Sequence, residues 1–322
     1  MSLATPRLRW KTRVGFGGGH HPYYGVLHVC PFGVIASGGA RSEETTIVDA
    51  DRGEARYQRK ALSIGVVGTD VITSTRQGDL VAYDASTGVE RGLSVTPGER
   101  PFHVDARSLF VVAPGDPAKL VCERAFDPRR GAGDVVRVFG PASHGGRATS
   151  SLVSAGAAVY DRATGDKLGQ GTYNITLAEP GWFAIERDRI ELHARTGVQW
   201  TCGKGELAGW DPRIVVVTTW SEGDGSSLVM LDRASGRTLH TTKSRPGKSW
   251  EGWGKAIVFD DHVVANDKHD ERDRSILRAL AFDGSEHWKL SLGENVWVVD
   301  VAATAARLYV LTASGHLHAF DR

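Results

Sequence analysis

The feature that most constrains the fold is a short strand-and-turn unit that recurs through the chain. It is clearest at residues 80–88, where the apolar segment LVAY precedes Asp84 and the turn ends at Gly88. Apolar, β-branched and aromatic residues in such a run favour a buried strand. The aspartate can accept backbone N–H groups of the next residues, and the glycine tolerates positive φ. The unit therefore predicts a strand, a tight turn and a second strand.

Eight copies of this unit follow one another along the chain. Their residues at the aspartate position are Asp49, Asp84, Asp127, Asp161, His193, Asp232, Asp283 and Asp321. A period of about 40 residues with several short strands per repeat predicts a β-propeller. We therefore predict an all-β fold, a single β-propeller domain over residues 1–322 with four-stranded antiparallel blades. The motif count favours eight blades, and seven is the alternative because the repeat near 140–165 is compressed.

The repeat resembles that of the PQQ-like β-propeller family. There, an apolar-aromatic strand end precedes Asp-x-x-Thr/Ser-Gly, and the next strand carries a tryptophan. Residues 78–88 and 308–321 match this pattern best, and the resemblance covers nearly the whole chain. It implies the propeller fold but little about function, because propellers carry many unrelated activities. Trp200 and Trp288 follow turn glycines as in the family, so we expect a structural role for them and for Trp10.

The two ends of the chain complement each other. Residues 8–14 alternate as a strand should and carry Trp10, but no turn precedes them. The last turn, after Asp321, has no strand after it. We predict that the N-terminal strand supplies the outer strand of the last blade and closes the ring, which would leave no exposed edge there.

Composition excludes several classes of function. The formal net charge is +1, which argues against a dedicated nucleic-acid surface. The sequence has no apolar run long enough to span a membrane as a helix. Cys30, Cys122 and Cys202 are far apart, without metal-type spacing, and their odd number favours a reducing compartment. We therefore expect a cytoplasmic protein, monomeric on its own, without a metal.

Candidate binding residues come from loops. In propellers, the loops between blades and those between the second and third strands of a blade project on one face, where binding sites gather. The two tryptophans of residues 249–255 are the most suggestive, because aromatic side chains on a rigid loop are good anchors for a partner. The alternative is that they pack between blades. The candidate interaction face comprises His20, His21, Tyr23, Tyr24, Trp210, Trp220, Trp250, Trp253, Asp267, His269 and Arg272.

These observations favour a non-enzymatic scaffold that binds another protein through its loop-rich face. One alternative is a quinoprotein-like oxidoreductase, but such enzymes carry adjacent cysteines, and no two are adjacent here. Another is a hydrolase or lyase with a site at the central channel, for which His193, His318 and Asp321 are candidates. The pair His20 and His21 would need a third ligand to hold a metal. We predict no cofactor.

Overall fold

The computed structural model describes residues 4–14, 25–38, 43–115, 118–142, 146–172, 174–221, 225–243, 253–267, 275–293 and 296–322. These residues form strands and turns, and none of the described ranges contains a helix. The strands make eight four-stranded antiparallel sheets, each built from strands that follow one another in the chain except at the termini. This confirms the predicted eight-bladed β-propeller and excludes seven blades, because the compressed repeat forms a complete blade. No described helix is long and apolar enough to cross a membrane.

The chain divides into two compact units, one of residues 1–58, 188–190 and 200–322, the other of residues 59–187 and 191–199. The first carries four blades, built from β2 (Gly25–Cys30), β3 (Gly33–Gly38), β4 (Glu44–Val48), β5 (Ala55–Arg59); β22 (Gly205–Trp210), β23 (Ile214–Ser221), β24 (Gly225–Asp232), β25 (Thr238–Lys243); β26 (Trp253–Val258), β27 (His262–Asp267), β28 (Ile276–Ala281), β29 (Glu286–Ser291); and β30 (Val298–Ala303), β31 (Arg307–Thr312), β32 (His316–Asp321) with β1 (Arg7–Arg13).

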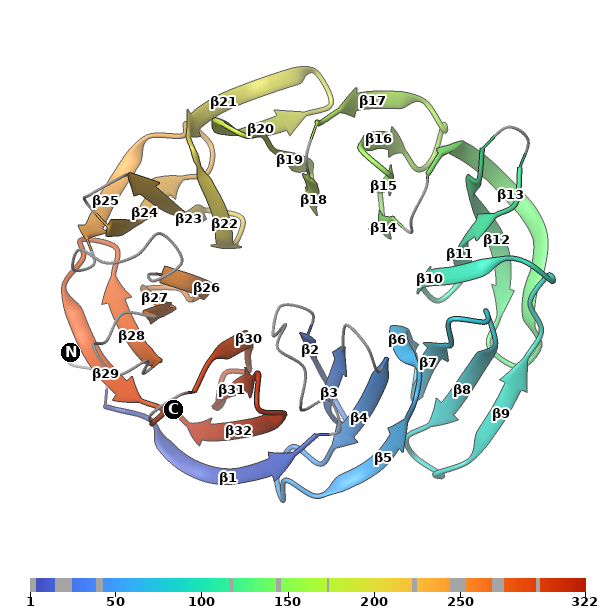
Figure 1. The fold of residues 1–322 in the computed structure, drawn as a ribbon, viewed down its shortest axis with the longest axis horizontal. Helices are drawn as coiled ribbons and strands as arrows, with labels where there is room; N and C mark the ends of the chain where they lie inside the picture. The colour runs from blue at the N-terminus through green and yellow to red at the C-terminus, as the bar shows by residue number, and fades with distance from the viewer. Residues whose placement is uncertain are drawn as a thin grey trace. The chain divides into compact units, whose positions relative to one another are not determined.

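The second unit carries three blades and most of a fourth. Their strands are β6 (Leu62–Val67), β7 (Asp70–Ser74), β8 (Leu80–Asp84), β9 (Glu90–Leu93); β10 (Arg100–Val104), β11 (Ser108–Ala113), β12 (Leu120–Asp127), β13 (Gly131–Pro141); β14 (Arg147–Ala148), β15 (Leu152–Ala155), β16 (Ala158–Asp161), β17 (Lys167–Gln170); and β18 (Asn174–Ala178), β19 (Gly181–Ile185), β20 (Arg189–Ala194), β21 (Gly197–Gly203). Figure 1 labels these strands.

The repeated aspartate acts as predicted. In the turn between β4 and β5, Asp49 Oδ1 accepts the N–H groups of Asp51 and Arg52, both at 2.8 Å. Gly53, at φ 74°, donates its N–H to the Asp49 carbonyl at 2.9 Å and so completes the turn. Short polar side chains that bond the backbone in this way favour turns over continued strands. The sequence therefore ends β4 at a defined turn.

Tryptophans of the outermost strands join neighbouring blades within the first unit. Trp10 Nε1 donates to the carbonyl of Ala50 at 3.1 Å, and Trp200 Nε1 donates to that of Arg233 at 2.7 Å. Each indole lies against the turn glycine of the next blade, Gly53 or Gly236, where a Cβ would come within 2.6 Å of the ring. Trp288 is also buried. The structural role predicted for these tryptophans is confirmed.

The N-terminal strand completes the C-terminal blade as predicted. Strand β1 pairs antiparallel with β32, with Arg7 opposite Asp321 and Arg13 opposite His316. Figure 1 shows β1 running along β32 as the outer strand of this blade. On one face of the blade, Trp10, Tyr309 and Leu317 pack with residues of β3 and β4. The edge of β32 is thereby covered, and the first and last segments of the chain share one hydrophobic core.

Candidate functional site

Most of the predicted interaction face cannot be placed. His20, His21, Tyr23, Tyr24, Trp250, His269 and Arg272 lie outside the described residues. Trp220 belongs to β23 and Trp253 to β26, but only their backbone is described. The loop-borne face therefore stays a prediction.

Two predicted residues are described together with their side chains. Trp210 is the last residue of β22, next to the turn between the first and second strands of its blade, and it is 38% exposed. This position differs from the inter-blade loop expected from the sequence. Asp267 is the last residue of β27, and its side chain is almost fully buried in an ion pair with Arg278 Nε at 2.9 Å. Trp210 is therefore partly exposed, whereas Asp267 is buried in an ion pair.

The residues considered for a hydrolase or lyase have structural contacts. His193 stacks on Trp182, with ring centroids 5.1 Å apart, and its Nε2 lies 2.9 Å from Glu191 Oε2. Asp321 forms ion pairs with Arg9 and Arg307 at 3.4 Å. Among the described residues, no group of three or more His, Cys, Asp or Glu side chains is placed to hold a metal ion. The stacking of His193 on Trp182 explains why this repeat tolerates a histidine where the others carry an aspartate.

A surface that the sequence analysis missed lies on β13, the outermost strand of its blade. Three of its side chains form what we call the valine surface: Val135, Val136 and Val138 are 47%, 57% and 48% exposed. Strand β13 has 11 residues, whereas the outermost strands of the neighbouring blades in this unit, β9 and β17, have four each. As the outer strand of its blade, β13 pairs with β12 on one side only, and these apolar side chains remain at the surface.

The register of β13 explains why adjacent valines are exposed. Arg137 pairs with Glu123 and Val135 pairs with Arg124, so Val136 is the extra residue of a β-bulge. A bulge breaks the alternation of a strand and turns side chains that would otherwise point to opposite faces. On the inner side, Phe139 packs against Phe110 and Tyr160 with centroid distances of 6.4 and 5.9 Å. The strand is therefore anchored by Phe139 while its valines face solvent.

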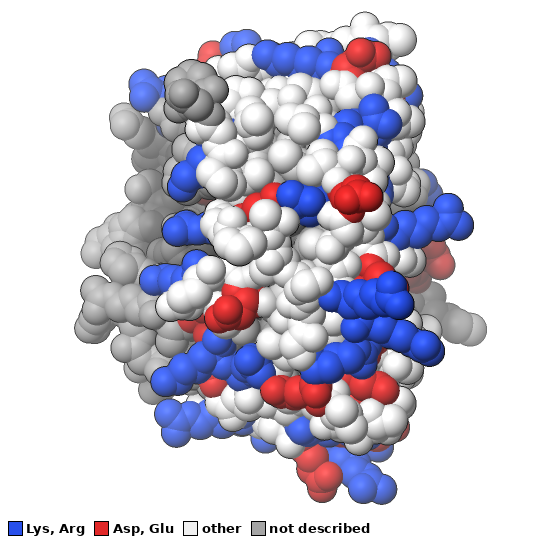
Figure 2. All heavy atoms as spheres, turned by 90° about the vertical axis from the view of Figure 1, so that its right-hand side faces the viewer, with Lys and Arg blue, Asp and Glu red and all other residues white. Residues whose placement is uncertain are grey.

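Two basic side chains lie just before the strand that carries the valine surface. Arg129 and Arg130 are exposed immediately before β13, and neither forms an ion pair with a described carboxylate. Figure 2 looks at the side where Figure 1 places β13, and it shows uncharged surface among Lys, Arg, Asp and Glu side chains. A cavity of about 540 Å³ is lined by Asp70, Asp84, Arg91, Pro128 and Arg129, just before β13. Two cations and a cavity thus precede the strand that carries the valine surface.

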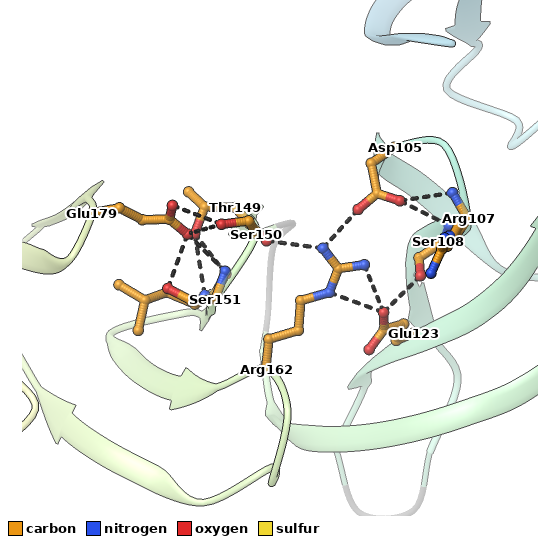
Figure 3. A network of polar contacts seen from close by, with 10 residues as sticks. Asp105, Arg107, Ser108, Glu123, Thr149, Ser150, Ser151, Arg162 and Glu179 are labelled. Carbon is orange, nitrogen blue, oxygen red and sulfur yellow. Dashed lines mark hydrogen bonds and ion pairs between the residues drawn. The ribbon is translucent and has the colours of Figure 1, made fainter.

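An ion-pair network holds the blade of β13 against the next blade (Figure 3). Arg162, which follows β16, binds Glu123 Oε1 through Nε and Nη2 at 3.0 and 2.8 Å. Its Nη1 contacts Asp105 Oδ2 at 2.6 Å and donates to the Thr149 carbonyl at 2.9 Å. Burial acts to raise the pKa of Asp105, but hydrogen bonds from the backbone of Arg107 and from Arg162 outweigh it and lower the pKa. The guanidinium therefore contacts two carboxylate groups, those of Glu123 and Asp105.

A third carboxylate extends the network to the blade of β18 (Figure 3). Glu179 accepts hydrogen bonds from Ser150 Oγ at 2.7 Å and from the Ser151 N–H at 2.6 Å. Burial acts to raise its pKa, but hydrogen bonds from Thr149, Ser150 and Ser151 outweigh this and lower the pKa to about 2. Three successive blades are thus joined by charged hydrogen bonds. The valine surface stands on a rigid support.

The comparisons with known proteins show the fold. No protein-family model matches the chain, and no curated protein matches it in sequence. The computationally designed Ika8 protein has 11% identity and a TM-score of 0.65, covering 97% of this chain and 100% of its own. Dihydro-heme d1 dehydrogenase NirN in complex with DHE has 13% identity and a TM-score of 0.58, covering 84% of this chain and 67% of its own. BamB from Moraxella catarrhalis has 14% identity and a TM-score of 0.46 over 99% of this chain and 100% of its own.

Proposed function

We propose that this chain is a non-enzymatic binding module that docks a partner protein on the valine surface of β13. The observation that carries this proposal is the exposure of three valines on one strand, 47–57% each. Apolar patches rimmed by polar residues mark interaction sites in soluble proteins. Rigid support by the Arg162 network favours binding, because little conformational freedom is lost when the partner docks.

The two basic side chains just before β13 favour an acidic partner. Arg129 and Arg130 have no carboxylate partner among the described residues, so the best complement is an apolar segment flanked by acidic side chains. The adjoining cavity of about 540 Å³ could accept one of its side chains. The loop-borne tryptophans predicted from the sequence belong to the same proposal as a second contact region.

The setting we propose is the cytoplasm. Cys30, Cys122 and Cys202 are free thiols, as a reducing compartment favours. The name of NirN describes a dehydrogenase, and its likeness to this chain is one of fold. No observation in the described residues favours the enzyme alternative over the binding module.

The test is an affinity capture from native lysate with matched variants. Val136→Glu/Val138→Glu places charge on the valine surface, and Val26→Glu/Val198→Glu is the control, because Val26 and Val198 are 60% and 53% exposed on other blades. We expect a stoichiometric partner that the wild type and the control retain and the β13 variant loses. A partner that all three retain would overturn the valine surface as its site. A Trp250→Ala/Trp253→Ala variant then tests the loops, and circular dichroism verifies that each variant is folded.

A further inference from the structure

Several cations of this propeller form ion pairs, but those in the second half of β1 form none with a described carboxylate. Arg124 contacts Glu99 at 2.6 Å, and Arg307 contacts Asp51 at 2.7 Å. Lys11 and Arg13 are exposed on β1, and no described carboxylate forms an ion pair with either. Two unpaired cations that project from the same strand create a local positive potential.

The pairing of β1 with β32 places two histidines beside these cations. Lys11 lies directly opposite His318, and Arg13 lies directly opposite His316. Directly opposed residues of antiparallel strands share a face of the sheet, with Cβ atoms about 5 Å apart. The rings of His316 and His318 have centroids 6.4 Å apart. The four basic side chains therefore gather on one face of the terminal blade.

The histidines are neutral at pH 7 in this arrangement. Burial, followed by Lys11 and His316, lowers the pKa of His318 to about 4. Burial, Lys11 and Arg13 likewise lower the pKa of His316. Ser314 Oγ lies 3.0 Å from His316 Nδ1, which orients the ring and leaves Nε2 for another partner. An anion at this place would favour protonation of both rings and so gain two further hydrogen-bond donors.

We propose that Lys11, Arg13, His316 and His318 bind a phosphoryl group. Lys and Arg provide charge and hydrogen bonds that suit phosphate oxygens, and each imidazolium adds a donor. The group is either free phosphate or a phosphoryl carried by a larger molecule. This site is independent of the valine surface.

The experiment follows the imidazole signals of the full chain by NMR, at constant ionic strength, during addition of inorganic phosphate or phosphoserine. We expect saturable shifts of the His316 and His318 signals, assigned with His316→Gln and His318→Gln, and an increase in both pKa values. Phosphoserine binding more tightly than phosphate would indicate a carried phosphoryl group, and the reverse order would indicate the free ion. Acetate serves as the singly charged reference and should bind more weakly.

A matched pair of variants locates the site. Lys11→Gln/Arg13→Gln should weaken phosphate binding at least about tenfold. Arg7→Gln/Arg9→Gln removes the same charge from the same strand and should leave the affinity within about twofold. Equal weakening in both variants, or no saturable shift in the wild type, would overturn the proposal. The titration of the wild type tests phosphate binding even if a variant does not fold.

Discussion

Gly236 lies against the indole of Trp200 from the preceding blade, and a side chain at this position would clash with that ring. Its φ is 71°, and a Cβ there would lie 2.6 Å from Trp200 Cγ. Left-handed backbone in a non-glycine residue costs about 1–2 kcal/mol, and overpacking adds about 1–3 kcal/mol. We expect Gly236→Ala to lower the free energy of unfolding by about 2–4 kcal/mol in urea denaturation.

Gly68→Ala is the control, since Gly68 has a φ of 62° but a methyl group at this position would meet no atom within 4 Å. It should show only the backbone effect, about 1 kcal/mol. Equal losses in the two variants would show that the indole contact of Gly236 contributes nothing.

Arg162 supports a second prediction at this scale. Arg162→Met leaves Asp105 and Glu123 without their cation, and removal of one member of a buried ion pair costs about 3–5 kcal/mol. Arg213→Met is the control, because Arg213 is 49% exposed beside Asp211 and such pairs contribute about 0–1 kcal/mol. Thermal and urea unfolding measure both. A loss below that of the control would mean that the network in Figure 3 is not a source of stability.

His318 makes stability depend on pH. Its pKa is about 4 in the folded chain, below the ordinary 6.5, so the unfolded chain binds the proton more tightly. Stability is therefore fully present above pH 6.5 and falls as the pH decreases toward 4. Urea midpoints in phosphate-free buffer should decrease over this window, and His318→Asn should flatten the decrease. An unchanged slope in this variant would assign the pH dependence to other groups.

At the scale of elements, β1 is the strand whose removal tests the terminal blade. Deletion of residues 1–14 exposes the edge of β32 and removes Trp10 from its contact with Tyr309, at a centroid distance of 6.1 Å. Loss of a packed tryptophan alone costs about 3–5 kcal/mol. We expect a clearly lower melting temperature and a tendency to associate through the free edge. Deletion of residues 1–6 spares β1 and should leave the melting temperature and the association state unchanged. An unchanged melting temperature after deletion of residues 1–14 would contradict the role of β1 in completing the terminal blade.

The elements were predictable where a local rule decides them. The turn at Asp49 follows from residues that are close in sequence. The placement of β1 follows from the strand that the last repeat lacks. The network of Arg162 was not predictable, since it joins residues of different repeats. The valine surface was visible as the run VVRV, but the bulge at Val136 depends on pairing with β12. Trp210 was assigned to a loop because strand ends are poorly defined by apolar pattern alone.

At the scale of the whole molecule, the prediction of a single domain implies that the two compact units unfold together. Each unit has its own buried clusters, such as Ile72 with Leu109 in one and Val264 with Leu308 in the other. Hydrogen exchange separates the possibilities, because it reports opening strand by strand. Arg162→Met destabilises the unit that contains β7, so a cooperative domain should lose protection equally in β7 and in β31 of the other unit. Loss confined to β7 would show that the units unfold independently, and Gly236→Ala, in the unit of β31, provides the reciprocal measurement.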